Sequence, residues 1–249
     1  MKIVALEFYK NGHMKEAFAF GGSIEKENIS ESKRYEASLQ NYLIDTGKEV
    51  ILIDTGLPVE TPDMKEQPDQ MIYTGEKVNN FIDALKEAGY ETKDIDKVVV
   101  THKHPDHSGE LRLFKDAKIY ISEIEAEAMN LNGENIVKVN FEDGEYKNFK
   151  ESKKIAENIF MLPAYGHTKG NSMVVAEFEG LQYMFHGDVT YTDEALRQNA
   201  LSVVFEDKAL AKDTLDNVRE FIMKNDTIYL STHTPEALIS LKEKKVMRL

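Results

Sequence analysis

One short segment constrains the fold and the chemistry of this chain more than any other. Thr101-His102-Lys103-His104-Pro105-Asp106-His107 follows directly on the apolar run Val98-Val99-Val100. It holds three of the seven histidines in the chain, together with a carboxylate. Imidazole nitrogen and carboxylate oxygen are ligands that suit zinc and its first-row neighbours. The pattern predicts a buried strand that delivers a metal-ligand loop to the edge of a sheet.

Composition limits the classes of protein to which the chain can belong. Its 249 residues are 41% hydrophobic and 30% charged, which predicts a globular protein with a substantial core. No segment approaches the roughly 20 apolar residues of a membrane span. The start, Met1 to Glu7, has one lysine and a short apolar run, so we expect a first strand and no secretory signal.

Charge and cysteine content narrow the partners and the compartment. The net charge of -13 argues against a nucleic-acid partner, which needs lysine and arginine against its phosphates. The chain has no cysteine, so disulfides and thiolate ligands are excluded. We therefore expect a cytoplasmic protein that acts on a small molecule, with neither nucleic acid nor membrane as partner.

The first half of the chain predicts strands, one hairpin and one helix. Strands are expected at residues 2–9 and in a hairpin of 38–44 and 49–54, joined by the turn at 45–48. Residues 10–36 are compatible with a surface hairpin or with a loop that contacts substrate. Residues 57–75 are expected to form an exposed excursion. An amphipathic helix that Gly89 closes is expected from apolar residues at helical spacing, namely Val78, Phe81, Ile82, Leu85 and Ala88.

The second half repeats this organisation. Helices are expected from Ser122 to about Leu131, opened by a capping box of Ser122 and Glu125, and around Ala211 to Ile222. Thr234 as N-cap and Pro235 at the first helical position predict a final helix. Short strands and turns are expected within 132–158, and further strands at 98–100, 117–121, 159–162, 172–178, 181–185 and 228–230. No Gly/Ser-rich or Pro-rich linker separates the halves, so we expect a single domain over residues 1–249.

Candidate metal ligands follow four separate strands: the 102–107 cluster, His167, Asp188 and His233. Strand ends from one layer can converge at one edge, as the site-forming loops of sheet-based enzymes do. The set contains five histidines and two aspartates, which is too many for one four-coordinate ion. It suits two ions that share a bridging carboxylate.

These residues resemble the metallo-β-lactamase superfamily over essentially the whole chain. The family motif His-x-His-x-Asp-His matches residues 102–107, and its later Gly-His-Thr, Gly-Asp and lone histidine match His167, Asp188 and His233 in order. Ile53-Asp54-Thr55-Gly56 after a strand is a further mark of the family. The resemblance implies an α/β (α+β) fold, a four-layer αβ/βα sandwich of two mixed β-sheets flanked by helices.

The resemblance also implies a ligand set. One metal would take His102, His104 and His167, the other Asp106, His107 and His233, and Asp188 would bridge them. Asp54 would orient a ligand imidazole through its other N–H, although a turn residue at a strand end is the alternative. Two divalent ions are expected, zinc first, with manganese, iron or cobalt as substitutes.

Two cations about 3.5–4 Å apart bring a bridging water near pKa ~7, so hydroxide forms at neutral pH. The same ions can polarise a carbonyl and hold the developing oxyanion. The expected reaction is hydrolysis of an ester, thioester, lactone, lactam or phosphoester, with Asp106 among the catalytic groups.

Within the superfamily, the chain is most similar to the quorum-quenching N-acyl homoserine lactone lactonases. The similarity lies in its length, in the excursion at 57–75 and in the short final helix. Tyr191 stands three residues after Asp188, as a tyrosine does in that subfamily, where the phenol contacts the substrate; a packing tyrosine is the alternative. The motifs are also compatible with an esterase, a glyoxalase II-like thioesterase, a phosphodiesterase, or a non-hydrolytic metal-binding sensor or scaffold.

The family's Pro-Gly-His-Thr-Pro-Gly-His is altered at Tyr165, Lys169 and Asn171. His186 is expected to be a buried strand-end histidine without a metal role, or to support a ligand, and His13 a loop histidine.

Overall fold

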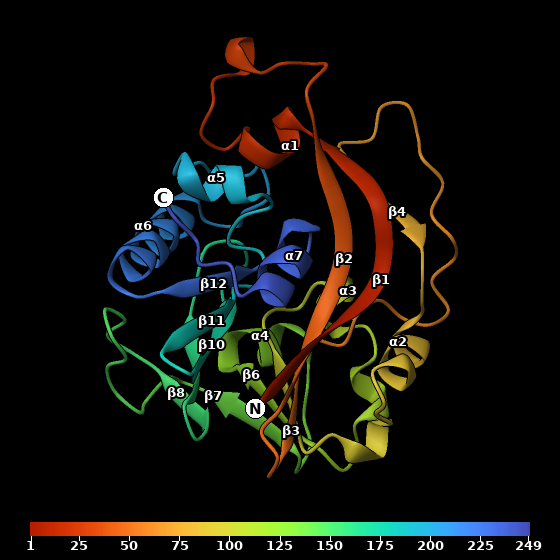
Figure 1. Cartoon of the computed structure of the whole chain (residues 1–249), viewed down its shortest axis with the longest axis vertical. Coiled ribbons are helices and arrows are strands. Elements are labelled where there is room, and N and C mark those ends of the chain that lie inside the picture. Colours follow the sequence, from red (N-terminus) through yellow and green to blue (C-terminus); the bar gives the residue numbers. More distant parts are fainter.

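Two mixed β-sheets form the centre of the computed structural model, which describes all 249 residues (Figure 1). The first sheet has seven strands in the order β4 (Ile72–Lys77), β1 (Lys2–Lys15), β2 (Arg34–Asp45), β3 (Val50–Ile53), β5 (Lys97–Val100), β6 (Lys118–Ser122) and β7 (Ile136–Val139). The second has five, in the order β12 (Thr227–Leu230), β11 (Leu181–Phe185), β10 (Ser172–Phe178), β9 (Ile159–Pro163) and β8 (Lys153–Ala156). Each sheet contains both parallel and antiparallel pairs.

Helices cover the outer faces, so the molecule has four layers. Alternate residues of each strand point to opposite faces. Ile51 therefore joins a core cluster between the sheets, whereas Leu52 packs outward with Phe81 and Leu85 of α2 (Phe81–Glu87). On the far side, α6 (Lys208–Lys224) buries Leu215, Val218, Phe221 and Ile222 against the second sheet. Figure 1 shows α2 and α6 on opposite sides of the molecule. The expected αβ/βα sandwich is confirmed.

The N-terminal strand is longer than predicted. β1 continues to Lys15 and pairs with β2 as far as Lys15↔Arg34, so the prediction of a strand ending at residue 9 is wrong. β4 satisfies the other edge of β1 between Tyr9 and Met14, which explains why a polar sequence remains extended there. The rest of 10–36 holds α1 (Glu16–Phe20) and a 3₁₀ turn at Lys26–Asn28.

Some predicted helix boundaries also need correction. The helix expected from Val78 begins at Phe81, because Asn80 accepts a hydrogen bond from the Asp83 N–H and caps it; Val78 is 41% exposed. β4 begins inside the excursion predicted for 57–75. The final helix, α7 (Glu236–Glu243), has Pro235 at its N-cap, so Thr234 is not the cap.

The capping box predicted at Ser122 is only half formed. Ser122 accepts from the Glu125 N–H, but the Glu125 carboxylate bonds elsewhere, and α4 (Glu123–Ala128) ends before Leu131. A short helix that the sequence does not predict is α5 (Asp193–Arg197), which Thr192 caps. The remaining short helices are α3 (Pro105–Ser108) and 3₁₀ turns at Thr92–Asp94 and Leu111–Leu113. None of the helices combines the length and the apolar character needed to span a bilayer.

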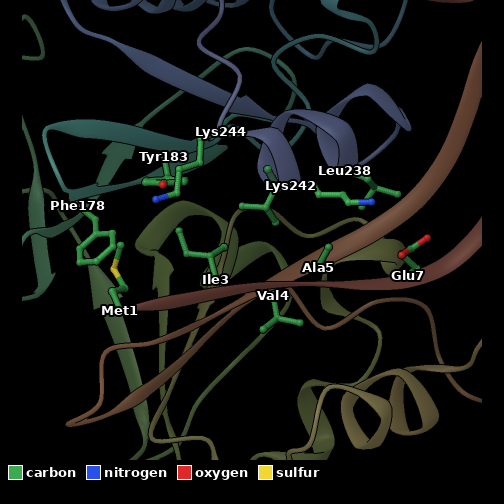
Figure 2. A pocket seen from close by; sticks show the side chains of 11 residues that line it. Met1, Ile3, Val4, Ala5, Glu7, Phe178, Tyr183, Leu238, Lys242 and Lys244 are labelled. Atoms are coloured by element: carbon green, nitrogen blue, oxygen red, sulfur yellow. The ribbon is translucent and has the colours of Figure 1, made fainter.

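A groove of about 490 Å³ lies between the start of β1, the β10–β11 turn and α7. Figure 2 shows Met1 beside Phe178, and Lys242 and Lys244 near the C-terminal end of α7. None of the candidate metal ligands lines this groove. The candidate ligands lie elsewhere in the molecule, at the ends of strands.

Candidate metal centre

All seven candidate ligands lie at the ends of strands from both sheets. The segment after β5, which includes α3, carries the 102–107 cluster. The loops after β9, β11 and β12 carry His167, Asp188 and His233. The Ser172 N–H donates to the carbonyl of Thr101 (2.9 Å), which ties the second sheet to the end of β5. The convergence expected from the sequence is therefore present.

The first cluster contains three histidines, His102, His104 and His167, and Asp188 lies with them. His102 Nε2, His104 Nδ1 and His167 Nε2 lie 3.0–3.1 Å from one another. Three nitrogens bound to a tetrahedral zinc at about 2.0–2.1 Å lie roughly 3.3 Å apart. The Nδ1 of His167 lies 3.1 Å from the carbonyl oxygen of Val204, an acceptor that leaves Nε2 free as a ligand. The triangle fits a divalent cation.

Asp106, His107 and His233 form the second cluster. The Nε2 atoms of His107 and His233 are each 3.2 Å from Asp188 Oδ1. All three atoms are buried and none has a hydrogen-bond partner. Leaving a buried polar atom unpaired costs about 1–3 kcal/mol. These unpaired atoms point at one another, as ligands around a cation do, so the second cluster also fits a metal.

Asp188 lies between the clusters. Its Oδ1 faces the second cluster, whereas its Oδ2 is 3.4 Å from His167 Nε2 and 4.0 Å from His102 Nε2. Burial alone would raise the pKa of Asp188, but His233 and His107 hold it well below its usual value. Asp188 is therefore ionised and contacts both clusters.

Asp54 and Thr101 support the ligands from behind. Asp54 Oδ2 lies 2.7 Å from His107 Nδ1 and accepts from the Thr101 hydroxyl (2.9 Å), while Oδ1 accepts from the Thr101 N–H (2.7 Å). Thr101 Oγ1 is also 3.0 Å from His102 Nδ1. These contacts favour the proton on Nδ1 and leave Nε2 of both imidazoles free. The sequence predicts a supporting role for Asp54 but not for Thr101, whose only signal is its place between the strand and the first histidine.

The histidine pKa values shift in opposite directions in the two clusters. Burial lowers the pKa of His102 well below its usual value and that of His167 to about 4, so both imidazoles are neutral and suited to metal ligation. Burial also opposes charge on His107 and His233, but Asp188 and other nearby carboxylates raise both pKa values. The carboxylates around the second cluster therefore favour positive charge at that position.

Tyr191 lies at the centre with its hydroxyl already engaged. The hydroxyl donates to Asp188 Oδ2 (2.7 Å), and the ring stacks on His233 with centroids 5.1 Å apart. Burial, and next the charge of Asp188, raise the pKa of Tyr191 well above its usual value, so the phenol remains a donor. Phe18 of α1 packs edge-on against Tyr191 at 4.7 Å, so the 10–36 segment reaches the site.

The remaining histidines and the altered loop residues are not among the two clusters. His186 is buried and stacks on Tyr229 at 3.9 Å; neither ring nitrogen has a partner, and burial lowers its pKa to about 3. His13 lies 3.5 Å from a carboxylate oxygen of Glu66. In the altered loop, the Asn171 amide donates to the carbonyl of Ala164 (2.8 Å) and closes the loop that carries His167.

Asp193, just beyond Tyr191, gives a stability prediction that depends on pH. Its side chain is buried, one oxygen has no partner, and burial, followed by Glu236, raises its pKa to about 6 from 3.8. The folded state therefore binds the proton more tightly than the unfolded state, so stability present below pH ~4 is lost as pH rises through about 6. Two pKa units correspond to at most about 3 kcal/mol.

We expect Asp193→Asn to raise the free energy of unfolding by about 2 kcal/mol at pH 7.5 and to leave it nearly unchanged at pH 4. Urea denaturation of metal-free protein at both pH values measures this difference. Asp213→Asn, at an exposed position on α6, is the control and should change little at either pH. An equal effect of Asp193→Asn at both pH values would contradict the explanation.

Comparisons with known proteins identify the family and agree with the fold. A family model described as the metallo-beta-lactamase superfamily matches residues 40–233. An N-acyl homoserine lactonase of Bacillus cereus is 26% identical over 203 residues, which cover 78% of this chain and 80% of the relative. A solved N-acyl homoserine lactone hydrolase with the product N-hexanoyl-L-homoserine at its metal centre superposes with a TM-score of 0.71 at 19% identity, covering 96% of this chain and 95% of that chain. AidC, described as a dizinc quorum-quenching lactonase, gives 0.68 at 15% identity over 94% of this chain and 88% of that chain.

Proposed function

This chain belongs to the metallo-β-lactamase superfamily, and we propose that it is a dinuclear metal-dependent hydrolase that opens the ring of N-acyl homoserine lactone-like substrates. The observation that carries the proposal is Asp188, one buried carboxylate whose two oxygens face two separate ligand clusters. A carboxylate with one oxygen toward each cluster is placed to bridge two cations. The substrate class is supported by the relatives named N-acyl homoserine lactonase and by Tyr191 at the centre.

We assign the ions to the two clusters described above. His102, His104 and His167 would hold one, Asp106, His107 and His233 the other, and Asp188 both. When bound, the two cations supply an activated water as nucleophile and polarise the scissile carbonyl. Zinc is proposed because the ligands are imidazoles and carboxylates, although manganese, iron or cobalt fits the same atoms.

The protein's own residues orient the ligands and shape the approach to the centre. Asp54 and Thr101 fix the imidazoles of His102 and His107 from the buried side. The Asp106 side chain is 26% exposed, and His104 is only half-buried, so substrate would approach from their side. Tyr191 holds its proton at Asp188 Oδ2, from where we propose that it donates to the oxygen that gains charge in the lactone.

A substrate screen tests this function. Metal-loaded protein is assayed on N-hexanoyl homoserine lactone, an acyl thioester and a phosphodiester, each beside a chelated sample. We expect metal-dependent turnover, with kcat/KM highest for the lactone. A higher value for the thioester or phosphodiester would reassign the substrate within the superfamily. Absence of turnover on every substrate would favour a metal-binding sensor or scaffold.

Metal content provides a second test. We expect two ions per chain in fully loaded protein, because each cluster offers three ligands and Asp188 reaches both. Elemental analysis after dialysis against zinc measures the ratio, and His233→Ala, which removes one ligand of the second cluster, should reduce it to one. A single ion in the loaded wild-type protein would contradict the bridged arrangement.

A further inference from the structure

Glu125 joins the two loops that carry the first cluster. One carboxylate oxygen, Oε2, accepts from the Lys103 N–H at 2.8 Å; the other, Oε1, accepts from the Gly170 N–H at 2.8 Å. Lys103 lies between His102 and His104, and Gly170 lies three residues after His167. The side chain of Glu125 is fully buried. A buried carboxylate is costly unless it is hydrogen-bonded, and here both oxygens are satisfied by backbone donors from the two loops.

Ser122 and Gly170 beside Glu125 allow the His167 loop to approach α4 closely. Ser122, at the start of α4, donates through its hydroxyl to the carbonyl of Gly170 (2.6 Å), so α4 bonds to both polar groups of that residue. A Cβ added to Gly170 would lie 2.5 Å from Ser122 Oγ and 2.9 Å from Glu125 Cγ. Glycine is therefore required for the His167 loop to approach α4 this closely.

The distance between these loops sets the geometry of the first cluster. His102 and His104 follow β5 of the first sheet, whereas His167 follows β9 of the second. Their three nitrogens lie 3.0–3.1 Å from one another, so the separation of the two loops decides whether all three can bind one ion. A shift of about 1 Å between the loops would remove one ligand from bonding distance of an ion held by the other two.

The second cluster has other supports. The Thr55 N–H donates to the His107 carbonyl (2.7 Å), and Asp54 holds the His107 ring. His233 lies in the loop after β12, and no hydrogen bond joins that loop to Glu125. Loss of the Glu125 contacts should therefore act on one cluster and spare the other.

We infer that Glu125 is a positioning residue for the first metal. It fixes the separation between the loop that carries His102 and His104 and the loop that carries His167. The inference rests on the proposed dinuclear function. Glu206 spans the same loops, accepting from Lys103 Nζ (2.6 Å) and from the Lys169 N–H (2.9 Å). Its side chain is 34% exposed, so water can replace these bonds, and its contribution to metal affinity should be smaller than that of Glu125.

The test is zinc affinity at each cluster separately, measured by competition with a chromophoric chelator. In a His233→Ala background, which keeps the first cluster intact, we expect Glu125→Gln to raise the Kd for zinc by about 10–100-fold. In a His104→Ala background, which keeps the second cluster, the same change should alter the Kd by less than about threefold. Glutamine keeps one acceptor but turns its NH₂ group toward the other backbone N–H.

Two controls separate positioning from general destabilisation. Glu127→Gln lies on the same helix at an exposed position and should leave both affinities unchanged. The Tm of metal-free protein reports on the fold, and a merely structural role would lower it without changing zinc affinity selectively. If Glu125→Gln does not fold, Glu125→Asp, which keeps the charge but shortens the reach, must show the same selectivity.

Equal affinities in variant and parent, or equal losses at both clusters, would overturn the inference. Failure of the proposed function would look different. In that case the wild-type protein would bind fewer than two zinc ions or would not hydrolyse lactones, whatever the behaviour of the Glu125 variants.

Discussion

Asp188→Ala is expected to reduce lactone turnover to background and to leave no more than one tightly bound metal ion per chain. Asp188 is the only carboxylate placed against both clusters, 3.2 Å from His107 Nε2 and 3.4 Å from His167 Nε2. Without it, two cations at short separation would repel each other with no shared anion between them. The loss of kcat should exceed the roughly 10²–10³-fold that follows removal of one hydrogen-bond donor, because a ligand of both ions is removed.

The measurement combines kcat on the best lactone with elemental analysis of the same sample. Asp193→Asn is the matched control, since Asp193 is also a buried carboxylate but lies outside both clusters. We expect the control to keep two ions and near-normal turnover. Near-normal turnover by Asp188→Ala would show that one ion suffices for the reaction.

Tyr191→Phe should lower kcat on the lactone by about 10²-fold, or roughly 3 kcal/mol of transition-state stabilisation. Only the hydroxyl is lost, while the stacking of the ring on His233 and its contact with Phe18 remain. The loss should appear in kcat as well as in kcat/KM if the bond strengthens in the transition state. At saturating zinc the variant should still hold two ions, because the hydroxyl contacts Asp188 and is not itself a member of either cluster.

The hydrogen bond from Tyr191 to Asp188 allows this experiment to distinguish two roles of the phenol. The phenol has one proton, and it is donated to Asp188 Oδ2 when no substrate is bound. A fall in metal content at saturating zinc would show that Tyr191 acts by holding Asp188 in place. Unchanged kinetics would reduce it to a packing residue and weaken the lactonase assignment. Phe18→Leu, which alters the apolar contact but keeps the hydroxyl, is the matched control and should leave kcat within about threefold.

Local patterns in the sequence predicted many of the strands and the places where candidate ligands follow them, whereas the resemblance to the superfamily implied the four-layer architecture. Continuous apolar runs along β3 and β5 mark strands that are buried on both faces. The hairpin of β2 and β3 follows from a turn of four residues. β10 and β11 were predicted with the bounds that the structure has. Each of these signals lies within about ten residues, so one window of sequence contains both the pattern and its cause.

Edges and helix ends were less predictable. β1 continues through polar residues because β4, some 60 residues away, supplies its second neighbour. Val78 fits the helical spacing that predicts a helix start, but the Asn80 side chain caps the helix two residues later. In both cases a specific hydrogen-bond partner, and not the hydrophobic pattern, decided where the element begins or ends.

The sequence by itself determined that histidines and aspartates follow four strands, and in an order that resembles one superfamily. Only the tertiary structure decided how each supporting polar group is used. Glu125 fits half of a local capping box, yet its carboxylate bonds to backbone groups 22 and 45 residues away. Asp54 contacts the ring of His107 across 53 residues of sequence, and the Tyr191 hydroxyl donates a hydrogen bond to Asp188. A buried polar group takes whichever partner the packing brings within hydrogen-bond distance, and that choice is made between sheets, not along the chain.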